Sequence, residues 1–109
     1  MRPAGRMWHS AAMHGARMHV LGGVNAKYDE YATWWELNFG TAGAGAGGAA
    51  GTWNLVLGND AAVNAGRFMH VAAIVKDTMW VFGGTGQSTY YSDFKAYALR
   101  DDQSLPSEY

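Results

Sequence analysis

Short apolar runs of strand length, separated by glycine and polar residues, recur along this chain. They occupy residues 10–14, 18–21, 31–39 and 52–57 in the first half and residues 71–75, 79–82 and 91–99 in the second. β-Branched and aromatic residues are common in these runs, as in strands, and no helical apolar period of comparable length competes with them. A short polar break follows the first run of each half and predicts a β-hairpin, so the pattern indicates an all-β chain.

The two halves of the chain repeat one another at an offset of 61 positions. Residues 5–12 align with residues 66–73 and share a glycine, an arginine, a histidine and two alanines. In the same register, the pair Gly22–Gly23 aligns with Gly83–Gly84. A regular period of this kind indicates stacked supersecondary units that cannot bury their apolar faces alone.

Each repeat is predicted to form one antiparallel sheet. The first repeat, residues 1–60, contains a Gly/Ala-rich run at 40–51 that is predicted to be a loop insertion. Surface loops tolerate such growth because closure entropy rises only slowly with length. The second repeat, residues 61–109, is predicted to lack its fourth strand, because no Trp-bearing apolar run follows Leu99.

These features resemble the kelch repeat, the blade unit of kelch β-propellers. The resemblance rests on Arg-x-x-His, an apolar strand that ends in Gly-Gly, and a later aromatic residue. The positions that carry it are Arg6, His9, Gly22, Gly23, Trp53, Arg67, His70, Gly83, Gly84 and Tyr97. It implies two kelch-type antiparallel four-stranded blades, and it implies that the Arg and His positions join neighbouring blades by hydrogen bonds.

A propeller typically has four to eight blades, so at most two blades cannot close a ring by themselves. The resemblance therefore implies an incomplete or fragmentary propeller. We expect a truncated product, an excised portion of a longer chain, or a protein that self-associates.

Composition and charge narrow the classes of partner. The 109 residues are 49% hydrophobic and 16% charged, which fits one small folded unit. The formal net charge of -1 supplies no field for nucleic acid or an anionic membrane, so neither is expected as a partner. No run approaches the length of a transmembrane helix and no signal peptide is expected. The compartment stays open, with the cytoplasm favoured.

Motifs for catalysis or cofactor binding are weak in this sequence. A Gly-x-Gly-x-x-Gly match at 43–48 lacks the strand and helix that a dinucleotide site needs. The spacing of five between His9, His14 and His19 places neighbours on opposite faces of a strand, and no closed ligand set accompanies them. We therefore predict no catalytic residue, no cofactor and no metal site.

The turns that differ between the repeats are the candidate partner-binding loops, since variable loops on a repeated scaffold often carry recognition. The candidates are Asn25, Lys27, Tyr28, Asn59, Asp60, Gln87, Ser88 and Tyr90. The alternative is that they are ordinary solvated turn residues, because Asn, Asp, Gly and Ser favour turns for local reasons.

The sequence thus predicts a non-enzymatic kelch-repeat interaction module, a scaffold or adaptor. Its partner would be another protein or further propeller blades, with self-association as a further possibility. One alternative is part of a kelch-propeller enzyme of oxidase or lyase type, whose active site needs further blades. Another is a remnant with no independent function.

Overall fold

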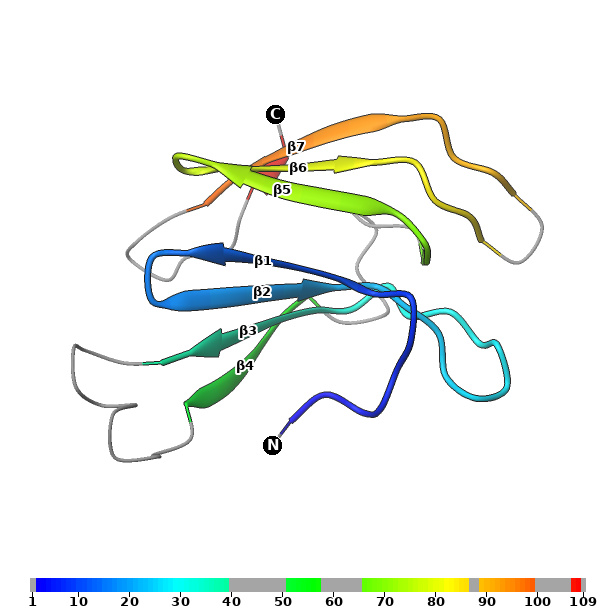
Figure 1. Ribbon diagram of the computed structural model, residues 1–109, viewed down its shortest axis with the longest axis horizontal. Helices are drawn as coiled ribbons and strands as arrows, with labels where there is room; N and C mark the ends of the chain where they lie inside the picture. Colours follow the sequence, from blue (N-terminus) through cyan, green and yellow to red (C-terminus); the bar gives the residue numbers. More distant parts are fainter. Residues whose placement is uncertain (1, 40–50, 58–65, 87–88, 100–106, 109) are drawn as a thin grey trace.

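The chain folds into two stacked antiparallel β-sheets (Figure 1). The computed structural model describes residues 2–39, 51–57, 66–86, 89–99 and 107–108. The strands are β1 (Ser10–His14), β2 (Arg17–Leu21), β3 (Trp34–Asn38), β4 (Thr52–Leu57), β5 (Val71–Val75), β6 (Thr78–Phe82), β7 (Phe94–Ala98) and β8 (Ser107–Glu108). Within these ranges no helix is long and apolar enough to cross a bilayer.

Both sheets follow the order of the sequence. The first is β1-β2-β3-β4 and the second is β5-β6-β7-β8. The all-β prediction is therefore confirmed. The second sheet has three strands of five residues, and a fourth position, where the sequence predicted no strand, is taken by the two-residue β8.

The third strands are shorter than predicted. β3 begins at Trp34 and β7 at Phe94, whereas the apolar runs begin three residues earlier. The residues before β3 and β7 belong instead to loops that return to the end of the preceding strand, with isolated bridges between Val24 and Glu30 and between Thr85 and Tyr90. The aromatic-rich runs therefore predicted the existence of β3 and β7 correctly, but not the residues at which these strands begin.

The two hairpin turns share one backbone conformation. Gly15 begins the β1–β2 turn with φ 60°, and Lys76 occupies the matching position of the β5–β6 turn with φ 55°. A positive φ at the first turn position is typical of a type II′ hairpin, which favours glycine there. The second repeat thus has Lys76 at this positive-φ position, where the first repeat has a glycine.

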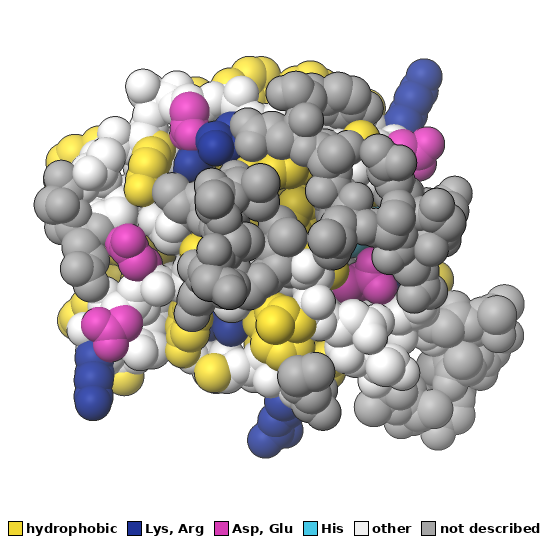
Figure 2. All heavy atoms as spheres, turned by 180° about the vertical axis from the view of Figure 1, so that it is seen from behind, with side chains coloured by type: hydrophobic (Ala, Val, Ile, Leu, Met, Phe, Trp, Pro, Cys, Tyr) yellow, Lys and Arg dark blue, Asp and Glu magenta, His cyan; other side chains and the backbone are white. Residues whose placement is uncertain are grey.

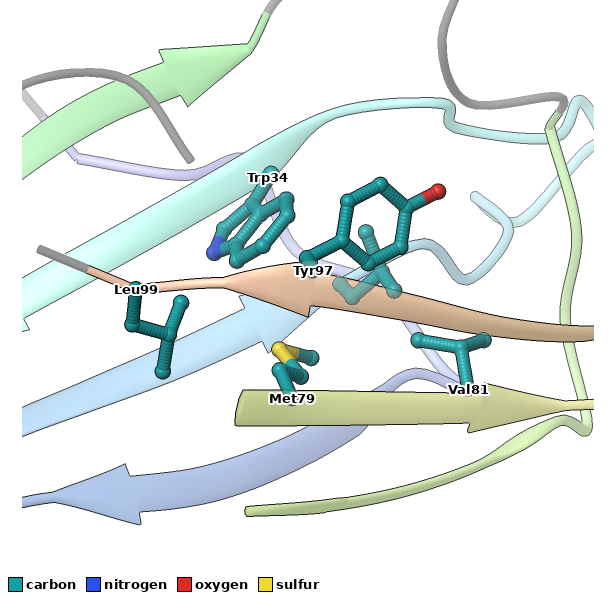
Figure 3. Packing of buried hydrophobic residues seen from close by; sticks show 6 residues of the cluster. Trp34, Met79, Val81, Tyr97 and Leu99 are labelled. Carbon is teal, nitrogen blue, oxygen red and sulfur yellow. The ribbon is translucent and has the colours of Figure 1, made fainter. Parts of the chain in front are cut away.

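The core lies between the two sheets and draws on both halves of the chain. Its buried members are Leu21, Trp34, Met79, Val81, Tyr97 and Leu99. Figure 3 shows Trp34 of β3 beside Tyr97 of β7, with Met79 and Leu99 close by. Neither sheet could bury these side chains alone, as the repeat predicted.

The sheets approach each other most closely at β1 and β5 (Figure 1). Small side chains face the interface on these two strands, including Ala12 and Ala72, whereas the bulky Trp34 and Tyr97 fill it at β3 and β7. The stacked pair is therefore a wedge, narrow at β1 and β5 and wider toward the outer strands.

Backbone and side-chain hydrogen bonds also join the sheets. The N–H of Gly23 donates to the carbonyl of Arg67 (2.9 Å), and the N–H of Met69 donates to the carbonyl of Trp8 (2.9 Å). The hydroxyl of Ser10 lies 2.6 Å from Nε2 of His70. These contacts fix the register of the two repeats.

The Arg and His repeat positions differ in what they bind. The guanidinium groups of Arg6 and Arg67 donate to carbonyls of their own repeats, Gly22 and Gly83, rather than across the interface. His70 does bridge the sheets, whereas His9 is exposed. The implied role of the arginines as inter-sheet hydrogen-bond donors is therefore wrong for their side chains.

Candidate functional site

One end of the two sheets carries the long loops of both repeats. Isolated bridges join Met7 to Val24 and Phe68 to Thr85, so the chain continues past β2 and β6 in extended form. The loops that follow project from the same end, on the right of Figure 1. The two-residue hairpin turns lie at the opposite end. We call the end that carries the loops after β2 and β6 the long-loop end.

The loop of residues 25–29 is held by its first side chain. Oδ1 of Asn25 accepts hydrogen bonds from the backbone N–H groups of Lys27 (2.9 Å) and Asp29 (3.0 Å). The backbone closes the same loop, because Tyr28 N–H donates to the Asn25 carbonyl and Asn25 N–H to the Asp29 carbonyl. An Asn side chain that bonds the backbone ahead of it is typical of a rigid turn.

Tyr28 belongs to an aromatic cluster that reaches from this loop to the second sheet. Trp8 stacks on Phe68 with centroids 5.6 Å apart, and its ring lies 6.0 Å from that of Tyr28. Phe68 is buried, whereas Trp8 and Tyr28 are 41% and 57% exposed. We call Trp8, Tyr28 and Phe68 the aromatic platform.

The backbone beneath the platform is strained. Trp8 and Tyr28 have φ of 60° and 64°, and Met69 has φ of 57°. A non-glycine residue in this region costs about 1–3 kcal/mol and persists only where its surroundings enforce it. Trp8 and Met69 occupy the same position of the two repeats, so the strain directs one large exposed apolar side chain per repeat out of the long-loop end.

The predicted loop residues divide into two groups. Asn25, Lys27 and Tyr28 share one loop, and Tyr90 lies in the other with 90% of its surface exposed. Asn59, Asp60, Gln87 and Ser88 lie outside the described residues. Trp8 and Phe68 were not predicted as site residues. Each lies between the repeated arginine and histidine, outside every predicted strand, and a large apolar residue at such a position is a signal that could have identified them.

Two arginines support the bases of the loops. Arg67 is buried and makes a bidentate hydrogen bond to Asp93 (2.7 and 2.9 Å), with its guanidinium carbon 4.2 Å from the ring centre of Tyr91. The hydrogen bond to Asp93 raises the pKa of Arg67, and the same bond lowers the pKa of the carboxyl. This pair is a structural anchor.

Arg6 makes the corresponding contacts without a carboxylate. It donates to Thr33 Oγ1 (2.9 Å) and lies over the ring of Tyr31, 4.1 Å from its centre. Burial lowers the pKa of Arg6, and the electrostatic interaction with Tyr31 opposes that shift. The two arginines thus occupy equivalent positions, but Arg67 binds a carboxylate whereas Arg6 binds a neutral hydroxyl.

Two buried histidines are neutral structural groups. Nδ1 of His19 accepts a hydrogen bond from Nε1 of Trp34 (2.9 Å), so this nitrogen carries no proton. Burial, with smaller contributions from His14 and Arg17, lowers the pKa of His19 to about 4. Burial, followed by the charges of Arg67 and His9, also lowers the pKa of His70 to about 4.

The site suits apolar recognition better than acid–base chemistry. Across the described ranges, no three His, Asp or Glu side chains form a group that could hold a metal ion. The two histidines with strongly lowered pKa values are buried, and their rings contact Trp34 and Ser10. The long-loop end instead offers exposed aromatic surface on a fixed backbone.

Comparison with known proteins shows the fold. No protein-family model and no curated protein matches this sequence. The solved structure of YjhT matches with a TM-score of 0.65 at 13% identity, over 99% of this chain and 28% of that chain. The arrangement of the two sheets therefore recurs within a protein of which this chain spans little more than a quarter.

Proposed function

We propose that this chain is a non-enzymatic protein-interaction module made of two kelch-type propeller blades. The repeated Arg-x-x-His and Gly-Gly positions support the family, and two stacked sheets in sequential strand order support the blade architecture. The likeness to 28% of the longer YjhT chain supports a place in a larger propeller.

The aromatic platform is the observation that carries the proposal. Tyr and Trp are enriched among the residues that contribute most to protein–protein binding, because they bury large surfaces at a low cost in side-chain entropy. Tyr28 is more than half exposed, yet its loop is fixed by Asn25 and its ring is supported by Trp8. Such a preformed anchor loses little freedom on binding.

The partner we expect is a protein segment with an apolar or aromatic side chain that can pack on Trp8 and Tyr28. No net charge is required of it, since the platform itself carries none. Lys27 and Asp29, which flank Tyr28 in the sequence, have opposite charges.

A differential capture experiment tests this function. The wild-type chain, Tyr28→Ala and Phe39→Ala would each be used as bait under the same conditions. Phe39 is the matched control, because it is an exposed aromatic residue at the hairpin end of the sheets, where its N–H binds Ala16. We expect proteins that the wild type and Phe39→Ala retain and that Tyr28→Ala loses.

The purified partner should then bind Tyr28→Ala at least about tenfold more weakly than wild type in calorimetry, as for an interface anchor. Equal affinity of all three baits would show that the long-loop end is not the binding surface.

A further inference from the structure

The outer side of the second sheet is an uncovered apolar face. We call it the distal face; it consists of Val71, Ala73, Val75, Trp80, Phe82 and Phe94. Strand alternation places these residues opposite the core, and the rings of Trp80 and Phe82 both contact Phe94, at 5.1 and 6.1 Å. Figure 2 shows hydrophobic side chains along the upper edge of the molecule, on the outer side of the second sheet.

Each distal-face position has a counterpart on the side of the first sheet that faces the second sheet. Leu21 and Trp34 are fully buried against the second sheet, whereas their counterparts Phe82 and Phe94 are 53% and 65% exposed. The second repeat therefore carries a packing face equivalent to that of the first, and no sheet among the described residues covers it. A contiguous exposed apolar surface of this kind marks an interaction site.

The uncovered face is also more apolar than the covered one. Ser10 and His14 use polar groups to reach His70 and Asp77 across the interface. Their counterparts are Val71 and Val75. His19 likewise has Trp80 as its counterpart. A face that only met water would not be expected to carry more apolar residues than the face that is covered.

The outer side of the first sheet is a second apolar face. We call it the proximal face; it consists of Ala11, Met13, Met18, Val20, Trp35, Leu37, Trp53 and Leu55. Its members correspond to the side of the second sheet that fills the core, where Met79, Val81 and Tyr97 match Met18, Val20 and Leu37. Met13 and Leu55 on this face are 52% and 43% exposed, whereas Val20 and Trp35 on its central strands are buried.

The backbone next to the distal face has room for a neighbour. A Cβ at Gly22 would lie 2.5 Å from the carbonyl oxygen of Arg67, because the second repeat passes there. At Gly83, the matching position, the nearest atom is the carbonyl oxygen of Tyr91 at 3.5 Å. Among the described residues, none takes at Gly83 the position that residues 67–70 occupy at Gly22.

The contacts of Gly23 and Glu30 across the two sheets also have no equivalent at the matching positions of the second repeat, Gly84 and Tyr90, among the described residues. Gly23 N–H donates to Arg67, whereas for its counterpart Gly84 no acceptor is found in the described ranges. Glu30 lies against Gly66 and Gly86 of the second repeat, whereas Tyr90 at the matching bridge position extends into solvent.

We propose that the distal face of one copy of this chain binds the proximal face of a second copy and reproduces the interface between its own two sheets. Residues 6–9 of the second copy would then fill the space at Gly83, and its Arg6 carbonyl would accept the Gly84 N–H. The second copy is the occupant because it carries a face matched position by position to the buried one, and because none of the residues that define the two faces is charged. This inference does not rest on the aromatic platform.

The contact is head-to-tail, so every copy offers one free face of each kind. Heterologous contacts close into a ring when the rotation per subunit permits and otherwise extend into a filament. The wedge shape of the stacked sheets favours closure, because each added sheet turns the array in the same direction.

The test blocks each face separately in the full chain. Phe82→Glu with Phe94→Glu blocks the distal face, and Met13→Glu with Leu55→Glu blocks the proximal face. We expect wild type to form a discrete assembly in size-exclusion chromatography with light scattering, and each blocked variant alone to be monomeric. An equal mixture of the two variants should form a one-to-one dimer and nothing larger, because one distal and one proximal face remain.

Lys76→Glu is the matched control, since it makes the same charge change at an exposed turn position, and a Cβ at its counterpart Gly15 would have no described atom within 4 Å; it should assemble like wild type. A folded monomeric wild type over the whole concentration range would overturn the proposal and leave further repeats of a longer polypeptide as the occupant. Assembly that neither blocked variant reduces would overturn it as well. Neither result bears on capture by Tyr28, which is scored separately.

A second measurement avoids dependence on the glutamate variants. The chain has no cysteine, so Phe94→Cys and Leu37→Cys each introduce a single thiol. These positions match Trp34 and Tyr97, whose rings touch across the sheets. Mixing the two variants with a short bis-maleimide should give a cross-linked heterodimer at least tenfold faster than either variant alone; equal rates would overturn the proposed pairing.

Discussion

Trp34 and Tyr97 meet edge to face between the two sheets, with ring centroids 5.2 Å apart and planes inclined by 80°. Trp34 is fully buried and also donates its indole N–H to His19. We expect Trp34→Ala to lower the free energy of unfolding by about 3–5 kcal/mol, since it removes a large buried side chain and leaves a cavity. Urea denaturation would measure the loss.

Phe39→Ala is the control for that variant, because this ring is partly exposed at the hairpin end. Its cost should stay below about 1.5 kcal/mol, as for a side chain that is only partly removed from water. Similar losses for Trp34→Ala and Phe39→Ala would mean that the core between the sheets does not dominate stability.

The stability of the fold should fall on acidification. His19 and His70 have their pKa lowered from 6.5 to about 4 by burial in the folded protein. Between these values the unfolded chain binds protons that the folded chain does not, so the free energy of unfolding decreases as the pH falls from 6.5 to 4. Each histidine contributes at most about 1.4 kcal/mol per pH unit.

Thermal or urea unfolding at several pH values would measure this slope. His19→Gln keeps an acceptor for Trp34 but removes one titrating group, so its slope should be shallower than that of wild type. Stability that is constant between pH 6.5 and 4.5 would contradict the neutral state of these two side chains.

The ion pair of Arg67 and Asp93 should matter more than its partial exposure suggests. Arg67 is 1% exposed, so Asp93→Ala leaves a buried cation without a carboxylate. Loss of one partner of a fully buried pair costs about 3–5 kcal/mol, and the 34% exposure of Asp93 reduces this to about 2–3 kcal/mol. The loss would be read from urea denaturation at neutral pH.

The first repeat offers the reciprocal change. Thr33 stands where the second repeat has Asp93 and already accepts a hydrogen bond from Arg6. Thr33→Asp should stabilise the fold by about 0.5–1.5 kcal/mol, as expected for a charge-assisted bond, and high salt should reduce this gain. A destabilised Thr33→Asp would show that the two arginine sites are not equivalent.

The loop that carries Tyr28 should lose its order when Asn25 is changed. Asn25→Ala removes the acceptor for two backbone N–H groups while leaving the core untouched. We expect faster hydrogen exchange at Lys27 and Asp29 and a loss of stability of at most about 1 kcal/mol. Unchanged exchange at both amides would mean that the backbone alone holds the loop.

The sequence predicted the strands and the repeat well because both depend on local and periodic signals. Five of the seven predicted runs match their strands to within one residue at both ends, and both predicted hairpins form. The beginnings of β3 and β7 were missed, because the preceding residues pair with Val24 and Thr85 through single bridges that leave no period in the sequence.

The candidate site was predicted only in part. Asn25 and Tyr28 were identified from turn composition, but Trp8 and Phe68 belong to another segment and meet Tyr28 only in three dimensions. The different partners of Arg6 and Arg67 depend on whether residue 33 or 93 is a carboxylate, a contact between positions 26 or 27 residues apart. Such pairings come from the fold and are not visible in a local motif.

The division of the core between the two repeats also sets the order in which the chain can mature during synthesis. The last residue of β4 is made well before Met79, Val81 and Tyr97, which cover Leu21 and Trp34. On the ribosome, Leu21 and Trp34 of the first sheet therefore stay uncovered by these residues until β7 has emerged. That interval is when the nascent chain most needs a chaperone, because an exposed sheet face can pair with any neighbouring polypeptide.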